Sequence, residues 1–562
     1  MIMNPRVPLF AGALVSGIAL AAAPAMAQPV TTITAEAIAA VDSSLEAEAL
    51  AAILKGGIAD HAQALADLDA RSISIPELEY RGQGAHQPRV RFLDIALEGV
   101  EDGVVASLAI GRMEVEDAEG VAGSFGPFTI SNLDLGAVLA LSQMLPDASG
   151  TPLALFSAAD FGAATLTTPE VKCSNEGLQL GRLVVPAIDW QAVEGDDQRT
   201  QEALRTFFSG LEFDGLETRG SACKGMSEGE EGLAFTLAAF SMDAITPGLW
   251  PETLLTGFDM QVETQGDIGR VAFGTMTFGS IDYAHVLEAA ARGLEDSFEN
   301  ARRFVPHFSG FSITDIRAEI PDSGAYGRMR VAIDGFSLDF DGWLNGLPTG
   351  IVVELRDQTL ELALADSMVQ SPEMESLTRL IVETPMSYRG ALRWDRESRT
   401  IALDSFHYQW GDLAAFTLSA TLTGASDTLF SYEESAQLLS LLALGVGPMQ
   451  LEFTDSGLIE RMAEFEALTG EADTTPAQLR SQLAKQLVEE LVSDETTPEM
   501  AAIAATIARF FQGGGTLTLS AVPADGASVS IHSFMASEAE PERLFDLFEI
   551  EARLVSGSGA LD

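Results

Sequence analysis

Few of the residues that could carry out catalysis are spaced as a catalytic motif requires. The nearest approach to a nucleophile elbow is the run AGSFG around Ser124, in which Ala122 stands in place of the first glycine. A glycine-rich turn explains the same run, because no clear junction from a strand to a helix accompanies it. We favour the turn and keep Ser124 as a candidate nucleophile.

Paired carboxylates are a second route to hydrolysis. The chain has 83 acidic residues, so some must lie close together by chance. A glycosidase needs only two carboxyl groups at the right separation. The alternative function left open is therefore a secreted hydrolase that uses paired carboxylates or Ser124.

The sequence contains no recognised motif for a metal or a nucleotide. The acidic run 114–119 lacks the ligand spacing of a calcium loop, and no P-loop or dinucleotide fingerprint is present. No two histidines are spaced three or four residues apart, as zinc ligands on one helix would be. We predict neither a metal nor a cofactor. The histidines are His61, His86, His285, His307, His407 and His532.

The two cysteines, Cys173 and Cys223, are expected to form a disulfide. Each lies a few residues before a strand-like run, 178–185 and 233–240. If those runs are equivalent parts of successive units, the two thiols lie side by side at one end of neighbouring strands. An oxidising compartment would then join them, and the bond would be structural.

An aspartate recurs where a strand-like segment gives way to a helix-like one. The clearest example is 327–347, where the apolar alternation changes parity after Asp334 and Gly335 and continues to Phe340. Such an aspartate suits a helix N-cap, because its carboxylate accepts hydrogen bonds from free backbone N–H groups. Calcium ligands or acid–base carboxylates are the alternative. The recurrent residues are Asp134, Asp189, Asp243, Asp282 and Asp339.

These patterns predict a β-rich α+β protein. Its main feature is a long, twisted, mostly antiparallel sheet of related strand pairs with short capped helices. We expect a helical segment over 28–72, a repeated β-rich region over 73–425 and a C-terminal α+β region over 426–562. Three helices with clear caps and apolar stripes are predicted in that last region.

Residues 1–27 have the features of a secretory signal peptide. Arg6 precedes an apolar run, and Ala25 and Ala27 provide small residues for cleavage after Ala27. No later apolar run reaches the roughly 20 residues that a spanning helix needs. We therefore expect an exported, periplasmic protein without a transmembrane segment.

The acidic composition limits the partners of this chain. Its net charge is −51 and its pI is about 4.2, which argues against nucleic acid and against anionic lipid head groups. Hydrophobic residues nevertheless make up 47% of the sequence, unlike a disordered chain. This apolar excess could fill a core or line an internal groove.

Three C-terminal runs resemble a known group of sequences. They are LEFTDSGLIERMAEF, TTPAQLRSQLAKQLVEELV and IARFFQGGGTLTLSAVP. They are similar to the C-terminal segment of uncharacterised exported proteins of alphaproteobacteria, which share a D-x-[GS]-L-[IV]-x-R helix start and a TPEQLR-like helix. The resemblance covers about the last fifth of the chain. It implies a Gram-negative periplasm and supplies no activity.

Together these observations favour a non-catalytic envelope protein. A curved sheet of this kind could bind an apolar or amphiphilic ligand, such as a lipid, or another envelope protein. The secreted hydrolase remains the alternative.

Overall fold

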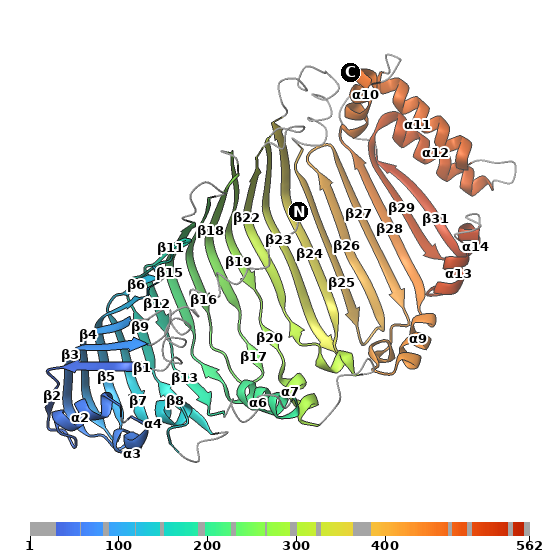
Figure 1. Ribbon diagram of the computed structural model, residues 1–562. Helices are drawn as coiled ribbons and strands as arrows, with labels where there is room; N and C mark the ends of the chain where they lie inside the picture. The colour runs from blue at the N-terminus through green and yellow to red at the C-terminus, as the bar shows by residue number, and fades with distance from the viewer. Residues whose placement is uncertain are drawn as a thin grey trace. The chain divides into compact units, whose positions relative to one another are not determined.

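The computed structural model describes residues 30–56, 58–82, 89–118, 120–145, 151–188, 197–225, 232–264, 267–292, 300–321, 328–363, 384–469, 475–491, 497–537 and 543–555. The predicted signal peptide and Asp189 lie outside these residues. Antiparallel strands dominate, with short helices between them, so the predicted β-rich α+β class is confirmed (Figure 1). The chain divides into two units, Met1–Gln265 and Gly266–Asp562.

The first unit begins with a closed, packed core. Strands β3 (Ala70–Gly82), β4 (Arg89–Glu101) and β5 (Val104–Glu116) pair in chain order. β1 (Val30–Glu36) and β2 (Ala39–Val41) pair with the other edge of β3. Apolar residues of these strands pack with Leu50 of α2 (Ala47–Leu54) into one buried cluster. This part of the sheet therefore has its hydrophobic face covered.

The rest of the first unit continues the antiparallel pairing. β6 and β7 both pair with β5, and the ladder then passes through β10 and β11 to β15, β16 and β18. Its remaining described elements are η1 (Ala59–His61), α3 (Ala62–Ala66), β6 (Ala122–Phe125), β7 (Phe128–Asp134), α4 (Leu135–Leu141), β8 (Pro152–Phe156), β9 (Ala158–Phe161), β10 (Ala164–Thr167), β11 (Val171–Asn175), β12 (Gly177–Leu180), β13 (Leu183–Pro186), α6 (Asp197–Gly210), β14 (Glu212–Phe213), β15 (Leu216–Gly225), β16 (Leu233–Met242), β17 (Leu249–Trp250) and β18 (Thr253–Thr264).

The second unit is a long antiparallel meander. β19 pairs with β22, and each strand from β22 to β29 pairs with the next, before β31 closes the order beside β29. The strands are β19 (Asp267–Phe278), β20 (Ile281–Asp282), β21 (His307–Phe308), β22 (Gly310–Ile320), β23 (Arg328–Leu344), β24 (Leu347–Ala363), β25 (Met386–Asp395), β26 (Thr400–Trp410), β27 (Ala414–Thr423), β28 (Gly445–Asp455), β29 (Gly515–Pro523), β30 (Val529–Ser530) and β31 (Phe548–Val555).

Short helices lie at the ends of this second sheet. They are α7 (Ala284–Ala291), η2 (Ala301–Phe304), η4 (Asp427–Phe430), α9 (Glu434–Leu442), α10 (Leu458–Thr469), α11 (Pro476–Leu491), α12 (Pro498–Gly513), α13 (Ile531–Ala536) and α14 (Leu544–Leu547). The three helices predicted in the C-terminal region are α10, α11 and α12. They pack on one another in order, and α12 contacts β29 and β31.

The parity change seen in β23 also occurs in its neighbours β22 and β24, where a left-handed residue accompanies it. Asp315 in β22 and Asp357 in β24 have left-handed backbone angles, with φ of 53° and 46°. Gly335 lies between their strands in β23, and a Cβ on Gly274 of β19 would lie 3.0 Å from the Cβ of Asp315. A left-handed residue shifts the side-chain alternation by one, and glycine leaves room beside it. The same hydrophobic side therefore continues along the full length of β22 and β24.

The described structure departs from the predicted organisation in two places. The segment 28–72, predicted as helical, also contains β1, β2 and the start of β3. The two units divide at Gln265 and Gly266, inside the predicted region 73–425. Residue 72 lies inside β3, and the division into units depends on which strands contact one another.

Candidate ligand-binding face

Strand register places the apolar residues of the second unit on one side of its sheet. Directly opposed residues of antiparallel strands point to the same side. Phe311 opposes Leu338, and Leu338 opposes Val353 on the next strand. In the same way Tyr388 opposes Tyr408. The apolar residues of seven neighbouring strands, β19 and β22–β27, thus form one continuous surface.

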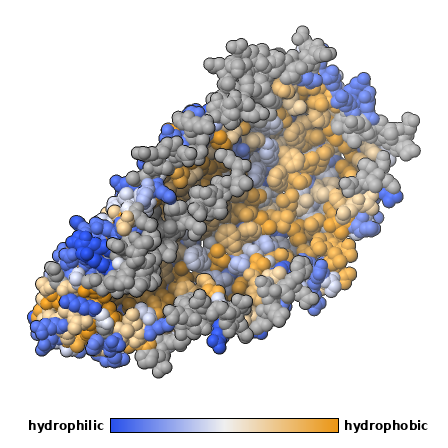
Figure 2. Space-filling view, in the orientation of Figure 1, coloured by the Kyte–Doolittle hydropathy of each residue, from blue (hydrophilic) through white to orange (hydrophobic). Residues whose placement is uncertain are grey.

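We call this surface the apolar face. Figure 2 shows hydrophobic side chains gathered over these strands. Its members are Val271, Phe273, Met276, Phe278, Phe311, Ile313, Ile316, Ala318, Ile320, Met329, Val331, Ile333, Phe336, Leu338, Phe340, Ile351, Val353, Leu355, Leu360, Tyr388, Leu392, Ile401, Leu403, Phe406, Tyr408, Phe416, Leu418 and Leu422.

Most side chains of the apolar face are only half-buried. Val271, Phe278, Ile320 and Leu392 are 39–45% exposed, and Leu355 is among the few that are buried. By contrast, Val90, Ile95 and Ile110 in the first unit are at most 8% exposed, because helices and strands enclose them. Within the described residues, the centre of the apolar face has no comparable covering layer.

The apolar side of the sheet is covered at the C-terminal end of the strand order. Phe510 of α12 is fully buried, and its ring centroid lies 5.4 Å from that of Phe453 in β28. Leu517 of β29 is also buried. Apolar side chains on this side therefore become buried where a helix packs on them, which distinguishes the covered end from the open strands.

At one end of β25, β26 and β27, η4 covers the apolar side of the sheet. Leu429 and Phe430 of η4 pack with Trp394, Ile401 and Leu422 in a buried cluster. The Trp394 indole Nε1 donates a hydrogen bond to the Ala425 carbonyl, at 2.7 Å. The apolar face thus ends on β25, β26 and β27 at the strand ends that carry Trp394, Ile401 and Leu422.

An aromatic stack lies at the corresponding end of β23. The rings of His285 and His307 are 4.0 Å apart, and His307 stacks on Trp343 at 5.0 Å. The Nε2 of His285 lies 2.8 Å from the Val305 carbonyl oxygen. Burial lowers the pKa of His307, His285 lowers it further, and Asp282 opposes both. This stack therefore favours the neutral form of His307.

The opposite side of the same sheet is polar. Arg270, Glu319, Arg330 and Glu361 alternate in charge across four strands. Arg330 lies 3.6 Å from Glu319 and 3.8 Å from Glu361. A shallow groove of about 270 Å³ lies over this row. Because its charges alternate and it is open to solvent, we assign it to the solvated side of the sheet.

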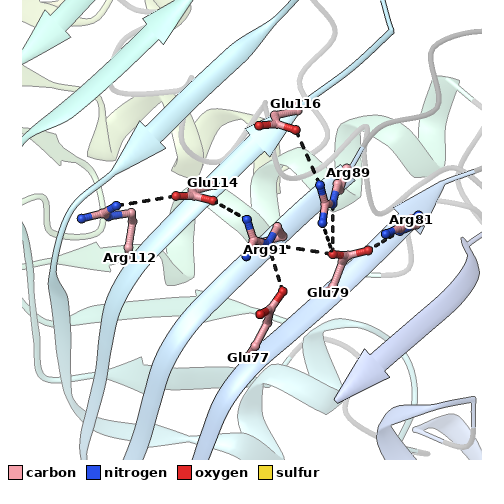
Figure 3. A network of polar contacts seen from close by, with 8 residues as sticks. All are labelled: Glu77, Glu79, Arg81, Arg89, Arg91, Arg112, Glu114 and Glu116. Carbon is pink, nitrogen blue, oxygen red and sulfur yellow. Dashed lines mark hydrogen bonds and ion pairs between the residues drawn. The ribbon is translucent and has the colours of Figure 1, made fainter. Parts of the chain in front are cut away.

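A related network covers the polar side of β3, β4 and β5 in the first unit (Figure 3). Glu79 is only 5% exposed, and its carboxylate accepts hydrogen bonds from Arg81 and Arg89. Arg91 joins Glu77 and Glu114, each at 3.0 Å. Burial would raise the pKa of Glu79, but the bonds from Arg89 and Arg81 lower it below its usual value.

Ser124, the candidate nucleophile, lies in this polar region. It belongs to strand β6 and opposes Glu114 on one side and Thr165 on the other. A nucleophile elbow instead places its serine at a sharp turn from a strand to a helix. None of the hydrogen bonds described for this chain joins Ser124 to a histidine. The geometry therefore gives the hydrolase alternative no supporting observation at Ser124.

The recurrent aspartates have different roles. Asp134 is the N-cap of α4, and its Oδ1 accepts a hydrogen bond from the Ala137 N–H at 2.8 Å. Asp282 accepts one from the N–H of Ala284, at the start of α7. Asp243 is followed by an irregular segment.

Asp339 requires a correction. It lies inside β23, which continues to Leu344, so the predicted helical turn is absent there and Asp339 caps no helix. Its pairing with Val352 and Gly310 keeps the chain extended. Strand pairing has therefore overridden the local helical pattern.

Cys173 and Cys223 form a disulfide and are direct register partners in β11 and β15. Their Cα atoms are 4.1 Å apart. They lie within the two strands, whereas the sequence placed them just before strand-like runs. Both residues are buried, which is consistent with a structural bond.

Two features are absent from the described residues. In this part of the chain, no three His, Cys, Asp or Glu side chains are grouped closely enough to hold a metal ion. None of the described helices combines the length and hydrophobicity that a bilayer-spanning helix requires.

The C-terminal strands and helices also carry a match to other proteins. Asp455 at the end of β28 is hydrogen-bonded to Arg480 of α11. Residues 408–554 match a family of uncharacterised proteins. This match covers about a quarter of the chain and includes α9 to α14. No curated protein matches the sequence.

Sequence reasoning did not identify the residues of the apolar face as one surface. Alternation of apolar and polar residues within each strand, as in 327–347, is a usable signal. The missing information was the register between strands, together with the absence of a covering layer over the described strands.

Proposed function

We propose that the second unit binds the apolar chains of an amphiphile, such as a lipid, along the apolar face. The observation that carries this proposal is the half-exposure of apolar side chains over seven neighbouring strands. Soluble proteins rarely expose a contiguous apolar surface of this extent unless it binds something. A bound apolar chain would remove these side chains from water.

The dimensions of the apolar face suit acyl chains. Seven strands about 4.8 Å apart span roughly 29 Å across the sheet. The hydrocarbon core of a bilayer is about 30 Å thick, so one acyl chain extends over about half of that distance. The surface is therefore wide enough for the chains of one lipid lying across the strands.

The composition of the apolar face also suits a flexible apolar ligand. Phe336, Phe340 and Phe406 are mixed with branched aliphatic residues and with Met276 and Met329. Methionine and aromatic side chains adapt to irregular apolar shapes. Bound charge would be disfavoured here, because the ionic residues of these strands lie mainly on the other side. We infer that a polar head group would stay at an edge of the sheet.

Co-purification tests this proposal directly. The protein is purified without detergent, extracted with organic solvent and analysed by mass spectrometry beside a mock purification. We expect an amphiphile at a defined stoichiometry. Binding of a fluorescent fatty-acid analogue to delipidated protein gives a second measurement. The proposal is wrong if no amphiphile co-purifies and the analogue does not bind.

The cellular location belongs to the same proposal. A chain that carries lipid between envelope layers would work in the periplasm, as the leader-like residues 1–27 predict. Mass spectrometry of the mature protein should give Gln28 as its first residue. An uncleaved N-terminus would contradict export by this route.

A further inference from the structure

Helix α9 has the reverse of the polarity expected for a helix on a protein surface. Leu438, Leu439, Leu441 and Leu442 are 57%, 68%, 43% and 62% exposed. Ser440, on the opposite side of the helix, is buried, and its hydroxyl has no hydrogen-bond partner among the described residues. A surface helix normally buries its leucines and exposes its serine. The exposed leucines of α9 therefore require an apolar partner.

These four leucines, the leucine patch, protrude from one end of the second unit. α9 contacts η4, which closes the lower end of the apolar face. After the helix, Leu444 is buried in the same cluster as Phe430, and its carbonyl accepts a hydrogen bond from the Ile531 N–H. The helix is thus held firmly at both ends while its leucines point away from the protein.

We propose that the leucine patch docks on the surface of a zwitterionic phospholipid bilayer. The size of the patch favours a bilayer over a second copy of this chain. A nine-residue helix is about 14 Å long and about 10 Å wide, so one face covers roughly 140 Å². A stable protein interface buries about 800 Å² on each partner. Insertion into a bilayer needs only a few apolar side chains.

The charges around the leucine patch also fit zwitterionic head groups. Arg303 lies 3.9 Å from the centre of the Tyr432 ring, and Arg302 lies 5.5 Å from it. Arg302 donates a hydrogen bond to the Ser431 carbonyl, and its Nη1 is buried. Arg303 has no ion pair with a carboxylate in the described part of the chain, so Arg303 is the cation offered to a phosphate. Glu433 and Glu434 follow Tyr432 directly and are exposed. Arginine suits a phosphate, and glutamate suits a choline or ethanolamine ammonium group.

The net charge of the chain excludes two other partners of the leucine patch. At −51, two copies repel each other, which disfavours a dimer through this small surface. An anionic membrane would also repel the protein. Binding should therefore be driven by the leucines, and salt should weaken it little.

Vesicle flotation with the full mature protein tests the docking. We expect the protein to float with phosphatidylcholine vesicles, and less with vesicles that contain phosphatidylglycerol. Leu438→Glu combined with Leu442→Glu should weaken vesicle binding at least tenfold. Ser435→Glu adds a charge to an exposed position of the same helix and should change binding less than twofold. Circular dichroism checks that each variant is folded.

The outcomes separate this inference from the proposed function. Loading of a fluorescent fatty-acid analogue is measured on the same variants and should be unchanged, because the leucine patch is not part of the apolar face. Failure of the analogue to bind any variant would remove the lipid-binding proposal alone. The docking proposal is wrong if the native protein does not float with the vesicles. It is also wrong if the Leu438→Glu, Leu442→Glu double variant floats to the same extent as the native protein. A dimer that the double variant abolishes would also overturn it.

Discussion

Asp455 and Arg480 form a buried ion pair that joins the end of β28 to helix α11. The Nη2 of Arg480 lies 2.7 Å from Oδ2 of Asp455, and the two side chains are 11% and 0% exposed. The other oxygen of Asp455 accepts a hydrogen bond from the Leu458 N–H at the start of α10, at 2.9 Å. One aspartate therefore fixes a strand end and two helices.

This pair joins two short sequence patterns of the C-terminal region, which lie within the residues that match the uncharacterised family. Asp455 is the aspartate of the D-x-[GS]-L-[IV]-x-R run, and Arg480 is the arginine of the TPEQLR-like run. Arg480 also donates hydrogen bonds to Glu460 and to the Phe511 carbonyl. Residues far apart in the sequence thus hold α10, α11 and α12 together.

Replacing Arg480 by methionine should lower the free energy of unfolding by about 3–5 kcal/mol, because Asp455 is left buried without its charge partner. Urea unfolding followed by tryptophan fluorescence measures the change. Arg461→Met is the matched control, since Arg461 and Glu464 are both exposed and the pair contributes less than about 1 kcal/mol. Equal effects of the two substitutions would contradict the role given to Asp455.

Glu79 should make the first unit sensitive to acid. Its pKa is lowered in the folded state, so its contribution is complete above the unfolded-state pKa of about 4.3. That contribution is lost as the pH falls through the lower folded-state pKa, where the carboxylate becomes protonated. Unfolding measured between pH 7 and pH 3 should show this loss.

Glu79→Gln should cost about 2 kcal/mol at pH 7 and reduce the dependence on pH, because the buried acceptor loses its charge. Glu116→Gln provides the comparison, since Glu116 is 59% exposed and lies 3.9 Å from Arg89. Its cost should stay under about 0.5 kcal/mol. The prediction is wrong if the free energy of unfolding of the Glu79 variant depends on pH as it does in the native protein.

The disulfide should stabilise the first unit. Cys173 and Cys223 are separated by 50 residues, and closing a loop of that length in the unfolded chain is worth about 4 kcal/mol in the chain-entropy model. The double substitution to serine should therefore lower the unfolding midpoint, and a reducing agent should do the same to the native protein. The double variant itself should not respond to the reducing agent.

The left-handed residue at Asp315 should tolerate asparagine and resist a branched side chain. Asp315→Val should cost about 1–2 kcal/mol, because a β-branched residue is strained at positive φ, whereas Asp315→Asn should be nearly neutral. Thermal unfolding compares the two. Thr277→Val, at an ordinary strand position, should cost less than Asp315→Val. A result in which valine matches asparagine would show that φ does not limit this position.

A charge on the apolar face should weaken amphiphile binding. Phe278→Glu places a carboxylate at a half-exposed position, and we expect at least tenfold weaker binding of a fluorescent fatty-acid analogue, or about 1.4 kcal/mol. Thr277→Glu adds the same charge to the polar side of the same strand and should leave binding within twofold of the native value. Equal losses in both variants would argue against the apolar face as the binding surface.

The sequence alone determined much of the local structure. Alternation predicted the β-rich class, and Thr497 with Pro498 marked the start of α12, where the Thr497 side chain accepts a hydrogen bond from Met500 N–H. Such signals are strong because a cap or an alternating strand depends on neighbouring residues only. The same local rules fail at 528–534: its residues alternate as in a strand, but β30 ends at Ser530 and helix α13 follows.

The tertiary structure alone decided what the strands present to solvent. A strand with one apolar side has the same alternating pattern whether that side packs in a core or lies on an open surface. Val90 is an example of the first case and Phe278 of the second. Register between distant strands and the presence of a covering layer depend on contacts that no local pattern encodes. The apolar face, the leucine patch of α9 and the Asp455–Arg480 pair therefore became visible only in the folded chain.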